Sequence, residues 1–117
     1  MRIVFDLDDT LCEGGSPYTN CQPFEGAKEM LEMLKASGHV VVIHTARGMS
    51  TYNGNVEEVE ANLRELTEQQ LEDWEFPIDE LYFGKPAGDF YVDDKGYRHR
   101  TVGYTRNLLE NYCSGET

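Results

Sequence analysis

The sequence predicts an α/β fold with an open parallel sheet and helices on both faces, which makes three layers. Apolar runs of strand length alternate with segments that carry an apolar stripe at helical spacing, an order typical of parallel strands joined by crossover helices. The 117 residues suffice for one domain but not for two that each bury a core, so we expect a single domain over residues 1–117. The 39% of hydrophobic and 11% of aromatic residues favour a packed interior.

The expected strands and helices follow one another without a repeat or a linker. The first strand is an apolar run without clean alternation, which is typical of a strand covered on both faces. The strands are expected at residues 2–8, 39–44, 81–83, 90–94 and 101–104. The helices are expected at residues 26–37, 56–71 and 107–112. Glycine, proline and asparagine in residues 12–25 favour a loop or a small hairpin.

Charge and cysteine content restrict the class of protein. The chain has 22 acidic and 10 basic side chains, and its net charge of −12 opposes binding to nucleic acid but suits binding of a cation. Cys12, Cys21 and Cys113 form no metal-type pair and leave one unpaired in any disulfide scheme, so we expect reduced thiols. No apolar run approaches the ~20 residues that span a bilayer, and the N-terminus does not resemble a signal peptide. We therefore expect a soluble, cytoplasmic protein with no membrane partner.

Polar and charged side chains follow the predicted strands at the point where each strand ends. Because ligands of an open parallel sheet bind at the carboxyl ends of its strands, we expect these side chains to meet at one rim. Core packing gives no reason for charged groups to follow one apolar strand after another. The residues at these strand ends are Asp6, Asp8, Thr45, Arg47, Lys85, Asp93 and Asp94.

The carboxylates at this predicted rim require either a cation among them or protonation of some of them. At ~4 Å and an effective dielectric constant of ~20, each pair of like charges is unfavourable by about 4 kcal/mol. A ligand set of oxygens alone suits Mg²⁺, which binds one or two carboxylates together with a substrate phosphate, whereas no histidine or cysteine has a zinc-type spacing. We therefore expect Mg²⁺ among Asp6, Asp8, Asp93 and Asp94, with Lys85 offsetting charge from the other side.

Asp6 and Asp8 also have the spacing of a reacting pair. Residues i and i+2 of a strand lie on the same side, so beyond the strand end both carboxylates can face one phosphorus atom. One carboxylate can attack as a nucleophile while the other handles the proton of the leaving oxygen. The spacing therefore predicts phosphoryl chemistry in addition to metal binding.

The sequence resembles the haloacid dehalogenase superfamily in the order of its motifs. From the N-terminus the matching motifs are Asp6-x-Asp8-x-Thr10, Thr45, Lys85 and Asp93-Asp94. The resemblance covers about residues 1–95 and implies a Rossmann-like three-layer α/β fold. The runs at residues 45–48, 83–86 and 91–95 look more narrowly like the small capsule-biosynthesis phosphatases of that superfamily.

The resemblance implies a role for each residue that matches a motif. Asp6 would be the nucleophile that becomes an aspartyl-phosphate, and Asp8 would be the general acid for the leaving alcohol and then the base for water. Thr45 would hydrogen-bond the transferring phosphoryl group, and Lys85 would offset charge on Asp6 and on the phosphate. Lys95 is the alternative to Lys85 in that role.

The same resemblance implies the ligands of the metal. Mg²⁺ would be held by Asp6, by the backbone carbonyl of Asp8 and by Asp93, with Asp94 binding it directly or through water. One position departs from the pattern, because Asp9 stands where the superfamily often has glycine. We expect this residue to alter the turn without removing a catalytic group.

The segments in which the superfamily carries a cap domain are short in this chain. Residues 11–25 are too few for a helical cap and residues 48–80 hold one helix with its loops, so no large cap is expected. The open rim then implies a bulky substrate, weak discrimination, or a second subunit that covers the site in a homo-oligomer. Arg47 is a candidate for binding a second anionic group of the substrate, with a surface salt bridge as the alternative. Three loop residues could line the site or pack within the loop: Tyr18, Asn20 and Cys21.

These observations together predict a Mg²⁺-dependent phosphomonoester hydrolase that acts through an aspartyl-phosphate. The likeness to the capsule phosphatases favours a sugar phosphate or a similar phosphorylated metabolite as substrate. A phosphatase of nucleic-acid ends is an alternative, against which the acidic balance counts. Two further alternatives are a receiver-like signalling module, whose motif order differs, and a phosphate-binding relative without hydrolysis, which the presence of Asp8 disfavours.

Overall fold

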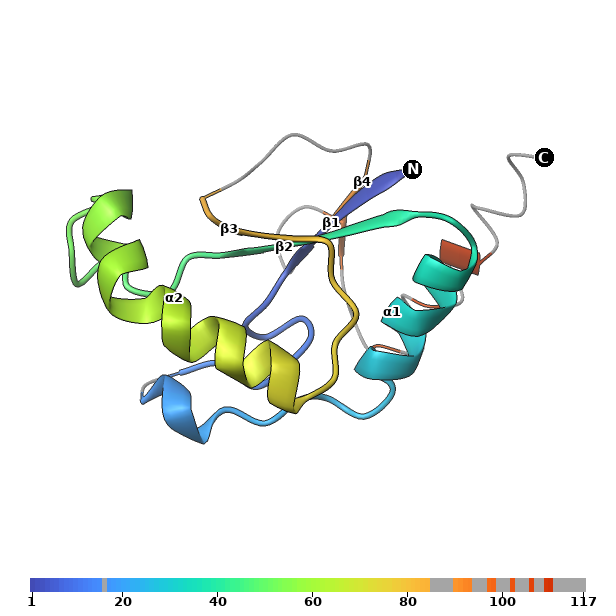
Figure 1. Ribbon diagram of the computed structural model, residues 1–117, viewed down its shortest axis with the longest axis horizontal. Helices are drawn as coiled ribbons and strands as arrows, with labels where there is room; N and C mark the ends of the chain where they lie inside the picture. The colour runs from blue at the N-terminus through green and yellow to red at the C-terminus, as the bar shows by residue number, and fades with distance from the viewer. Residues whose placement is uncertain are drawn as a thin grey trace.

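The computed structural model describes residues 1–15, 17–84, 90–93, 97–98, 102, 106 and 109–110. Its centre is a five-stranded sheet whose paired strands are parallel (Figure 1). The strands are β1 (Arg2–Asp6), β2 (Val40–Thr45), β3 (Glu80–Phe83), β4 (Phe90–Asp93) and β5 (Tyr97–Arg98). The helices are the short 3-10 helix η1 (Tyr18–Asn20), α1 (Ala27–Ala36) and α2 (Val56–Asp73). The predicted α/β fold with an open parallel sheet is confirmed.

Strand β1 lies at the centre of the sheet, whose strand order is β3-β2-β1-β4-β5. The register pairs Asp6 of β1 with His44 of β2, and Phe5 of β1 with Val92 of β4. The carboxyl ends of these three parallel strands therefore lie side by side at one edge of the sheet. The middle residues of β1 are fully buried, as expected for a central strand: Ile3, Val4 and Phe5.

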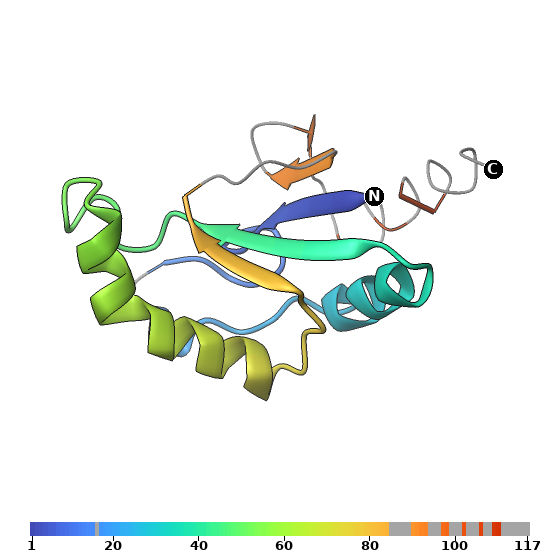
Figure 2. The same ribbon diagram turned by 45° about the horizontal axis from the view of Figure 1, so that its top comes forward.

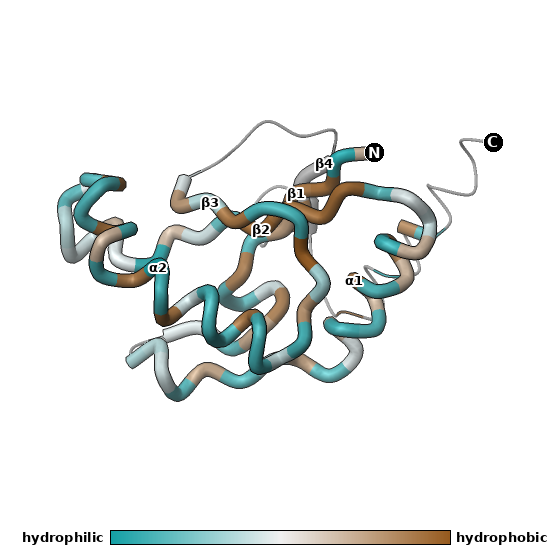
Figure 3. Tube along the Cα trace, viewed as in Figure 1, coloured by the Kyte–Doolittle hydropathy of each residue, from teal (hydrophilic) through white to brown (hydrophobic). Residues whose placement is uncertain are grey.

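Helices α1 and α2 lie on the same side of the sheet (Figure 2). The chain steps from β1 to β2 and on to β3 in one direction, and right-handed crossovers that step in one direction place their helices on one face. Phe5 and Ile43 belong to the core cluster with Met30 and Leu34 of α1, and Figure 3 shows β1 and β2 as mostly hydrophobic stretches of the trace. Helices α1 and α2 thus cover one and the same face of the sheet.

The helix boundaries follow from local signals in the sequence. In α1 the buried residues recur at helical spacing, and Gly38 follows the helix with a φ of 86° that a glycine adopts without steric strain. Helix α2 begins after Asn55, whose side chain accepts a hydrogen bond from the backbone N–H of Glu58 at 3.3 Å. It ends at Asp73, shortly after Leu71, the last residue of the predicted apolar stripe. Among the described residues, neither helix has the length and apolar character that a bilayer span requires.

One predicted strand near the C-terminus is wrong where the structure describes it. Val102 lies in the predicted strand 101–104 but is helical, and its side chain is buried in the core cluster. The edge position beside β4 is taken by β5, which begins at Tyr97 and was not predicted. Leu109 and Glu110 are helical, in agreement with the helix expected over residues 107–112.

Candidate active site

The strand ends bring together those predicted site residues that the structure describes. Asp6 is the last residue of β1 and Thr45 is the last residue of β2, and the two strands are neighbours in parallel register. Asp93 ends β4, one position beyond the register pair Phe5–Val92, so the backbone of β4 places it next to Asp6. Three predicted site residues lie outside the described residues: Lys85, Asp94 and the alternative lysine, Lys95.

A tight turn after β1 fixes the position of Asp8. The Leu7 carbonyl accepts hydrogen bonds from the backbone N–H groups of Thr10, Leu11 and Cys12, at 3.3, 2.9 and 3.3 Å. The strand predicted over residues 2–8 therefore ends at Asp6, since the backbone beyond it bonds within the turn. This turn directs the Asp8 side chain toward the end of β2.

Asp9 has the left-handed conformation that this turn requires, with a φ of 66°. Glycine adopts this region without a steric penalty, which accounts physically for the glycine that the superfamily often has here. The Asp9 carboxylate also accepts a hydrogen bond from the backbone N–H of Gly14 at 3.2 Å. Asp9 therefore supports the loop after the turn.

Two residues of the loop after β2 hold the Asp8 carboxylate. The Nε of Arg47 donates to both carboxylate oxygens at 3.1 Å, and its Nη2 donates to Oδ1 at 2.9 Å. The Oγ1 of Thr45 donates to Oδ2 at 3.2 Å and accepts the backbone N–H of Arg47 at 3.1 Å. The Asp8 side chain retains 20% of its exposure, whereas that of Arg47 is fully buried. One edge of the carboxylate is thus fixed while the other faces the rim.

The alternative of a surface salt bridge for Arg47 is wrong, because this residue is 1% exposed. Its Nη1 donates to Gln70 Oε1 at 2.5 Å and to Thr67 Oγ1 at 3.4 Å, and both acceptors lie on α2. Burial on its own would lower the pKa of Arg47, but the Asp8 carboxylate outweighs burial and holds that pKa above its ordinary value. Arg47 is therefore a charged residue of the interior.

The sequence interpretation missed Thr67 and Gln70. A signal was present, since both polar residues occupy positions of the inner face of α2 and both are buried. Polar side chains on a buried helix face require hydrogen-bond partners, and here the partner is the guanidinium of Arg47.

Of the three loop candidates, Tyr18 contributes to the wall behind the site. The Arg47 guanidinium lies 4.9 Å from the centre of the Tyr18 ring. The Tyr18 hydroxyl accepts the backbone N–H of Gly48 at 3.2 Å, and its carbonyl accepts Gln70 Nε2 at 2.6 Å. Asn20 is exposed and Cys21 is buried. Tyr18 therefore packs against both the loop after β2 and helix α2.

The Cys12 thiol is buried beside the site and is not a nucleophile there. Its Sγ lies 3.7 Å from Asp8 Oδ1 and 4.0 Å from Arg47 Nη2. Burial raises the pKa of Cys12, and the nearby Asp8 carboxylate adds to the effect, so the thiol stays protonated. Cys12 and Cys21 are free thiols, as expected, and Cys113 lies outside the described residues.

The acidic residues that the structure describes at the rim offer the oxygen ligands that a hard cation prefers. Asp6 and the backbone of Asp93 stand at adjacent strand ends, and both residue types offer oxygen ligands of the kind that Mg²⁺ prefers. No group of three or more His, Cys, Asp or Glu side chains that could hold a metal occurs among the described residues, which do not include Asp94. The Mg²⁺ site thus stays a prediction from the sequence.

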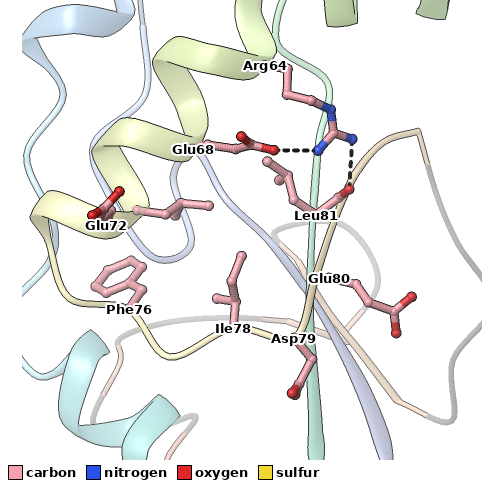
Figure 4. Close-up of a pocket in the computed structure, with 9 residues that line it drawn as sticks. Arg64, Glu68, Glu72, Phe76, Ile78, Asp79, Glu80 and Leu81 are labelled. Atoms are coloured by element: carbon pink, nitrogen blue, oxygen red, sulfur yellow. Dashed lines mark hydrogen bonds and ion pairs between the residues drawn. The ribbon is translucent and has the colours of Figure 1, made fainter.

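A pocket of about 500 Å³ lies away from this rim, between α2 and β3 (Figure 4). Arg64 and Glu68 line it from α2 and form an ion pair at 2.8 Å, which Figure 4 marks. Asp79 and Glu80 line it from the β3 side, and they pair with Lys35 and Arg2. The pocket contains none of the predicted site residues, and these four charged residues are paired with one another or with neighbouring side chains.

Comparison with known proteins finds relatives among solved structures. No family model matches the chain, and no curated protein matches it. The crystal structure of a protein from Vibrio cholerae is 31% identical with a TM-score of 0.71, and the match covers 95% of this chain and 98% of that chain. A conserved protein from Bacteroides thetaiotaomicron is 18% identical with a TM-score of 0.61, covering 96% and 91%.

A third solved structure is matched over only part of its length. It is a chain of the Pnkp1/Rnl/Hen1 RNA repair complex, 22% identical with a TM-score of 0.50. The match covers 92% of this chain and spans 30% of the chain in the complex. At that identity the likeness concerns the fold alone. The chain belongs to the same family as the Vibrio cholerae protein, and its fold is that of the haloacid dehalogenase superfamily without a large cap.

Proposed function

We propose that the chain is a Mg²⁺-dependent phosphomonoester hydrolase that acts through an aspartyl-phosphate on a sugar phosphate or a similar phosphorylated metabolite. The observation that carries this proposal is the arrangement of two carboxylates at the end of the central strand. Asp6 ends β1, and Asp8 lies two residues later with one carboxylate edge fixed by Thr45 and Arg47. This arrangement suits a nucleophile beside a group that moves a proton.

In the proposed first step, a carboxylate oxygen of Asp6 attacks the phosphorus atom. The bond between phosphorus and the alcohol oxygen breaks, the aspartyl-phosphate forms, and the leaving oxygen takes the proton of Asp8. In the second step water attacks the phosphorus, Asp8 takes a proton from the water, and inorganic phosphate leaves as the Asp6 carboxylate is restored. Asp8 ends protonated, as it began, so protons and charges balance over the cycle.

The remaining roles are proposed from the motifs. Thr45 hydrogen-bonds the transferring phosphoryl group, for which its hydroxyl proton turns from Asp8 Oδ2 to the phosphate. Lys85 offsets the charge of that group, with Lys95 as the alternative. Asp6, the Asp8 carbonyl, Asp93 and Asp94 would hold Mg²⁺; bound there, the ion reduces the repulsion between the carboxylates and the phosphate.

The proposal extends to the setting of the enzyme. We expect a single domain over residues 1–117 that works in the cytoplasm, where the free thiols of Cys12 and Cys21 stay reduced. The open rim leaves room for a second copy of the chain to cover the site. Size-exclusion chromatography with light scattering, at several protein concentrations, measures whether such a dimer forms.

The test is the hydrolysis of p-nitrophenyl phosphate and of hexose phosphates in the presence of Mg²⁺. We expect Asp6→Asn to lower kcat at least about 10³-fold, because an amide does not replace the carboxylate nucleophile. Asp9→Asn is the matched control, since it changes an exposed neighbouring acid and is expected to keep full activity. Full activity of Asp6→Asn would overturn the mechanism, and full activity after metal removal with EDTA would overturn the role of Mg²⁺.

A 3′-phosphorylated oligonucleotide in the same assay separates the proposal from the alternative of a nucleic-acid end phosphatase. With a net charge of −12, the chain is expected to hydrolyse the oligonucleotide more slowly than hexose phosphates. A preference for the oligonucleotide would reverse the assignment of the substrate class.

A further inference from the structure

We infer that Arg47 is a positioning residue that sets the orientation of the Asp8 carboxylate and does not bind the substrate. This inference rests on the proposed phosphatase function, in which Asp8 moves the proton in both steps. It replaces the role in substrate binding that the position of Arg47 after Thr45 suggested from the sequence.

The hydrogen bonds of Arg47 account for every donor that its side chain has. A guanidinium carries five N–H donors and no acceptor. The Nε–H is shared by the two Asp8 oxygens, and Nη2 donates to Asp8 Oδ1 and contacts the Cys12 thiol. Nη1 donates to Gln70 and Thr67. In the described part of the chain, no N–H of Arg47 is left over for an anionic group of a substrate.

The surroundings of Arg47 hold its guanidinium in one place. Tyr18 covers one face of the guanidinium, and Gln70 binds both Arg47 and the Tyr18 carbonyl. Gly48 follows Arg47 with a φ of 76°, and a Cβ at this position would lie 2.6 Å from Leu63 Cδ1 of α2, so the loop is closely packed on that helix. Three elements therefore hold in place the guanidinium that donates to Asp8: the loop after β1, the loop after β2 and α2.

In contrast to the buried Arg47 side chain, the Asp8 carboxylate is partly exposed on its outer edge. Its side chain is 20% exposed and lies in a turn, so without Arg47 it could rotate away from the end of β1. Proton transfer needs a hydrogen-bond distance to the leaving oxygen, and a small displacement of a catalytic group lowers the rate strongly. Removing Arg47 should thus lower the rate by displacing Asp8. The effect should be largest in the step in which the leaving oxygen needs a proton.

A double-mutant cycle with two substrates tests this inference. Arg47→Met and Asp8→Asn are made singly and together, and kcat and KM are measured with an alkyl phosphate and with p-nitrophenyl phosphate, whose leaving group needs little protonation. We expect Arg47→Met to lower kcat/KM, which reports the step that releases the alcohol, about 100-fold on the alkyl phosphate and less than about 10-fold on the aryl phosphate. In the Asp8→Asn background the same substitution should change kcat/KM less than about 3-fold on either substrate.

Arg64→Met is the matched control, because it removes an arginine of α2 that pairs with Glu60 and Glu68 away from the rim. Its turnover should equal that of the wild type. Should Arg47→Met fail to fold, as judged by circular dichroism, Arg47→Lys keeps the charge with fewer donors, and it should show the same dependence on leaving group and on Asp8 at a smaller amplitude.

The outcomes separate this inference from the proposed function. An equal loss on both substrates that persists in the Asp8→Asn background, with a raised KM, would assign Arg47 to substrate binding and overturn the inference alone. Full activity of Asp6→Asn, or a wild type that hydrolyses neither phosphate, would overturn the proposed function and the inference with it.

Discussion

Two arginines of the described chain, Arg47 and Arg64, pair with carboxylates in very different surroundings. Arg47 is fully buried and binds Asp8 at the rim, whereas Arg64 is 35% exposed on α2 and binds Glu60 and Glu68 one turn away on either side. A surface ion pair along a helix contributes little, because water and salt screen it. A buried pair leaves an uncompensated charge when one partner is removed. We therefore expect the Arg47–Asp8 pair at the rim to matter more for stability than the Arg64 pairs beside the α2–β3 pocket.

The largest effect is expected from removing each arginine in turn. Arg47→Ala should lower the free energy of unfolding by about 3 kcal/mol, at the low end for a buried pair because Asp8 keeps some exposure. Arg64→Ala should lower it by about 1 kcal/mol or less. Urea denaturation of both variants measures the difference, and equal losses would contradict the contrast between the two pairs.

A smaller effect is expected from two glycines with similar backbone conformations. Gly48 and Gly54 have φ values of 76° and 78°, but only Gly48 has a close neighbour, Leu63 Cδ1, where a Cβ would lie. Gly54→Ala should therefore destabilise by the left-handed strain alone, about 1 kcal/mol. A Cβ at Gly48 must also displace the end of the Leu63 side chain, so Gly48→Ala should destabilise somewhat more, by about 1–2 kcal/mol in total. Thermal denaturation of the pair checks the difference, and identical melting temperatures would count against close packing of the rim loop.

A still smaller and pH-dependent effect is expected at the α2–β3 pocket. Burial on its own would raise the pKa of Asp79, but hydrogen bonds from Lys35 and the Val41 N–H outweigh burial and lower it from its usual 3.8. A carboxyl with a lowered pKa stabilises the fold above its ordinary pKa and loses that contribution as the pH falls through the lowered value.

Asp79→Asn should therefore destabilise by about 0.5 kcal/mol near neutral pH, where the partly exposed pair with Lys35 is screened. The difference from the wild type should close as the pH drops below about 4. Urea titrations at several pH values measure it, and a difference that widens toward low pH would show that the sign is wrong.

The smallest effect is expected at Asp9 in the turn after β1. Glycine relieves the left-handed strain of this residue but removes the acceptor for the Gly14 N–H, so the two changes offset each other within about 0.5 kcal/mol. Asp9→Gly should also keep its phosphatase activity. A large loss of activity at unchanged stability would show that the Asp9 carboxylate takes part in the site.

The sequence predicted the features that arise from local pattern. The apolar runs that end at Asp6 and Thr45 identified two neighbouring strand ends, because parallel strands of a sheet deliver their carboxyl ends to one edge. The inward turn of Arg47 was not predictable in this way. Its acceptors Thr67 and Gln70 lie 20 and 23 residues further along the chain, and they meet it only when α2 packs on the sheet.

Near the C-terminus the local pattern was misleading for the same physical reason. The propensity of residues 101–104 favours a strand, but burial of Val102 in the core cluster with α1 outweighs that preference. The strand beside β4 is formed instead by Tyr97 and Arg98, a segment without a strong apolar pattern. Tertiary packing determines the secondary structure of such short segments, and the pattern of a single sequence does not reveal that packing.

The most direct test of the central claim is to look for the covalent intermediate on Asp6. The wild type and Asp8→Asn are mixed with Mg²⁺ and p-nitrophenyl phosphate, quenched with acid within the first turnovers, and digested for mass spectrometry. We expect a phosphoryl group on the peptide that contains Asp6, with a larger fraction modified in Asp8→Asn, because that variant lacks the base that activates water. Turnover of the substrate with no phosphoryl group on Asp6 in either protein, or a phosphoryl group on another residue, would contradict the account.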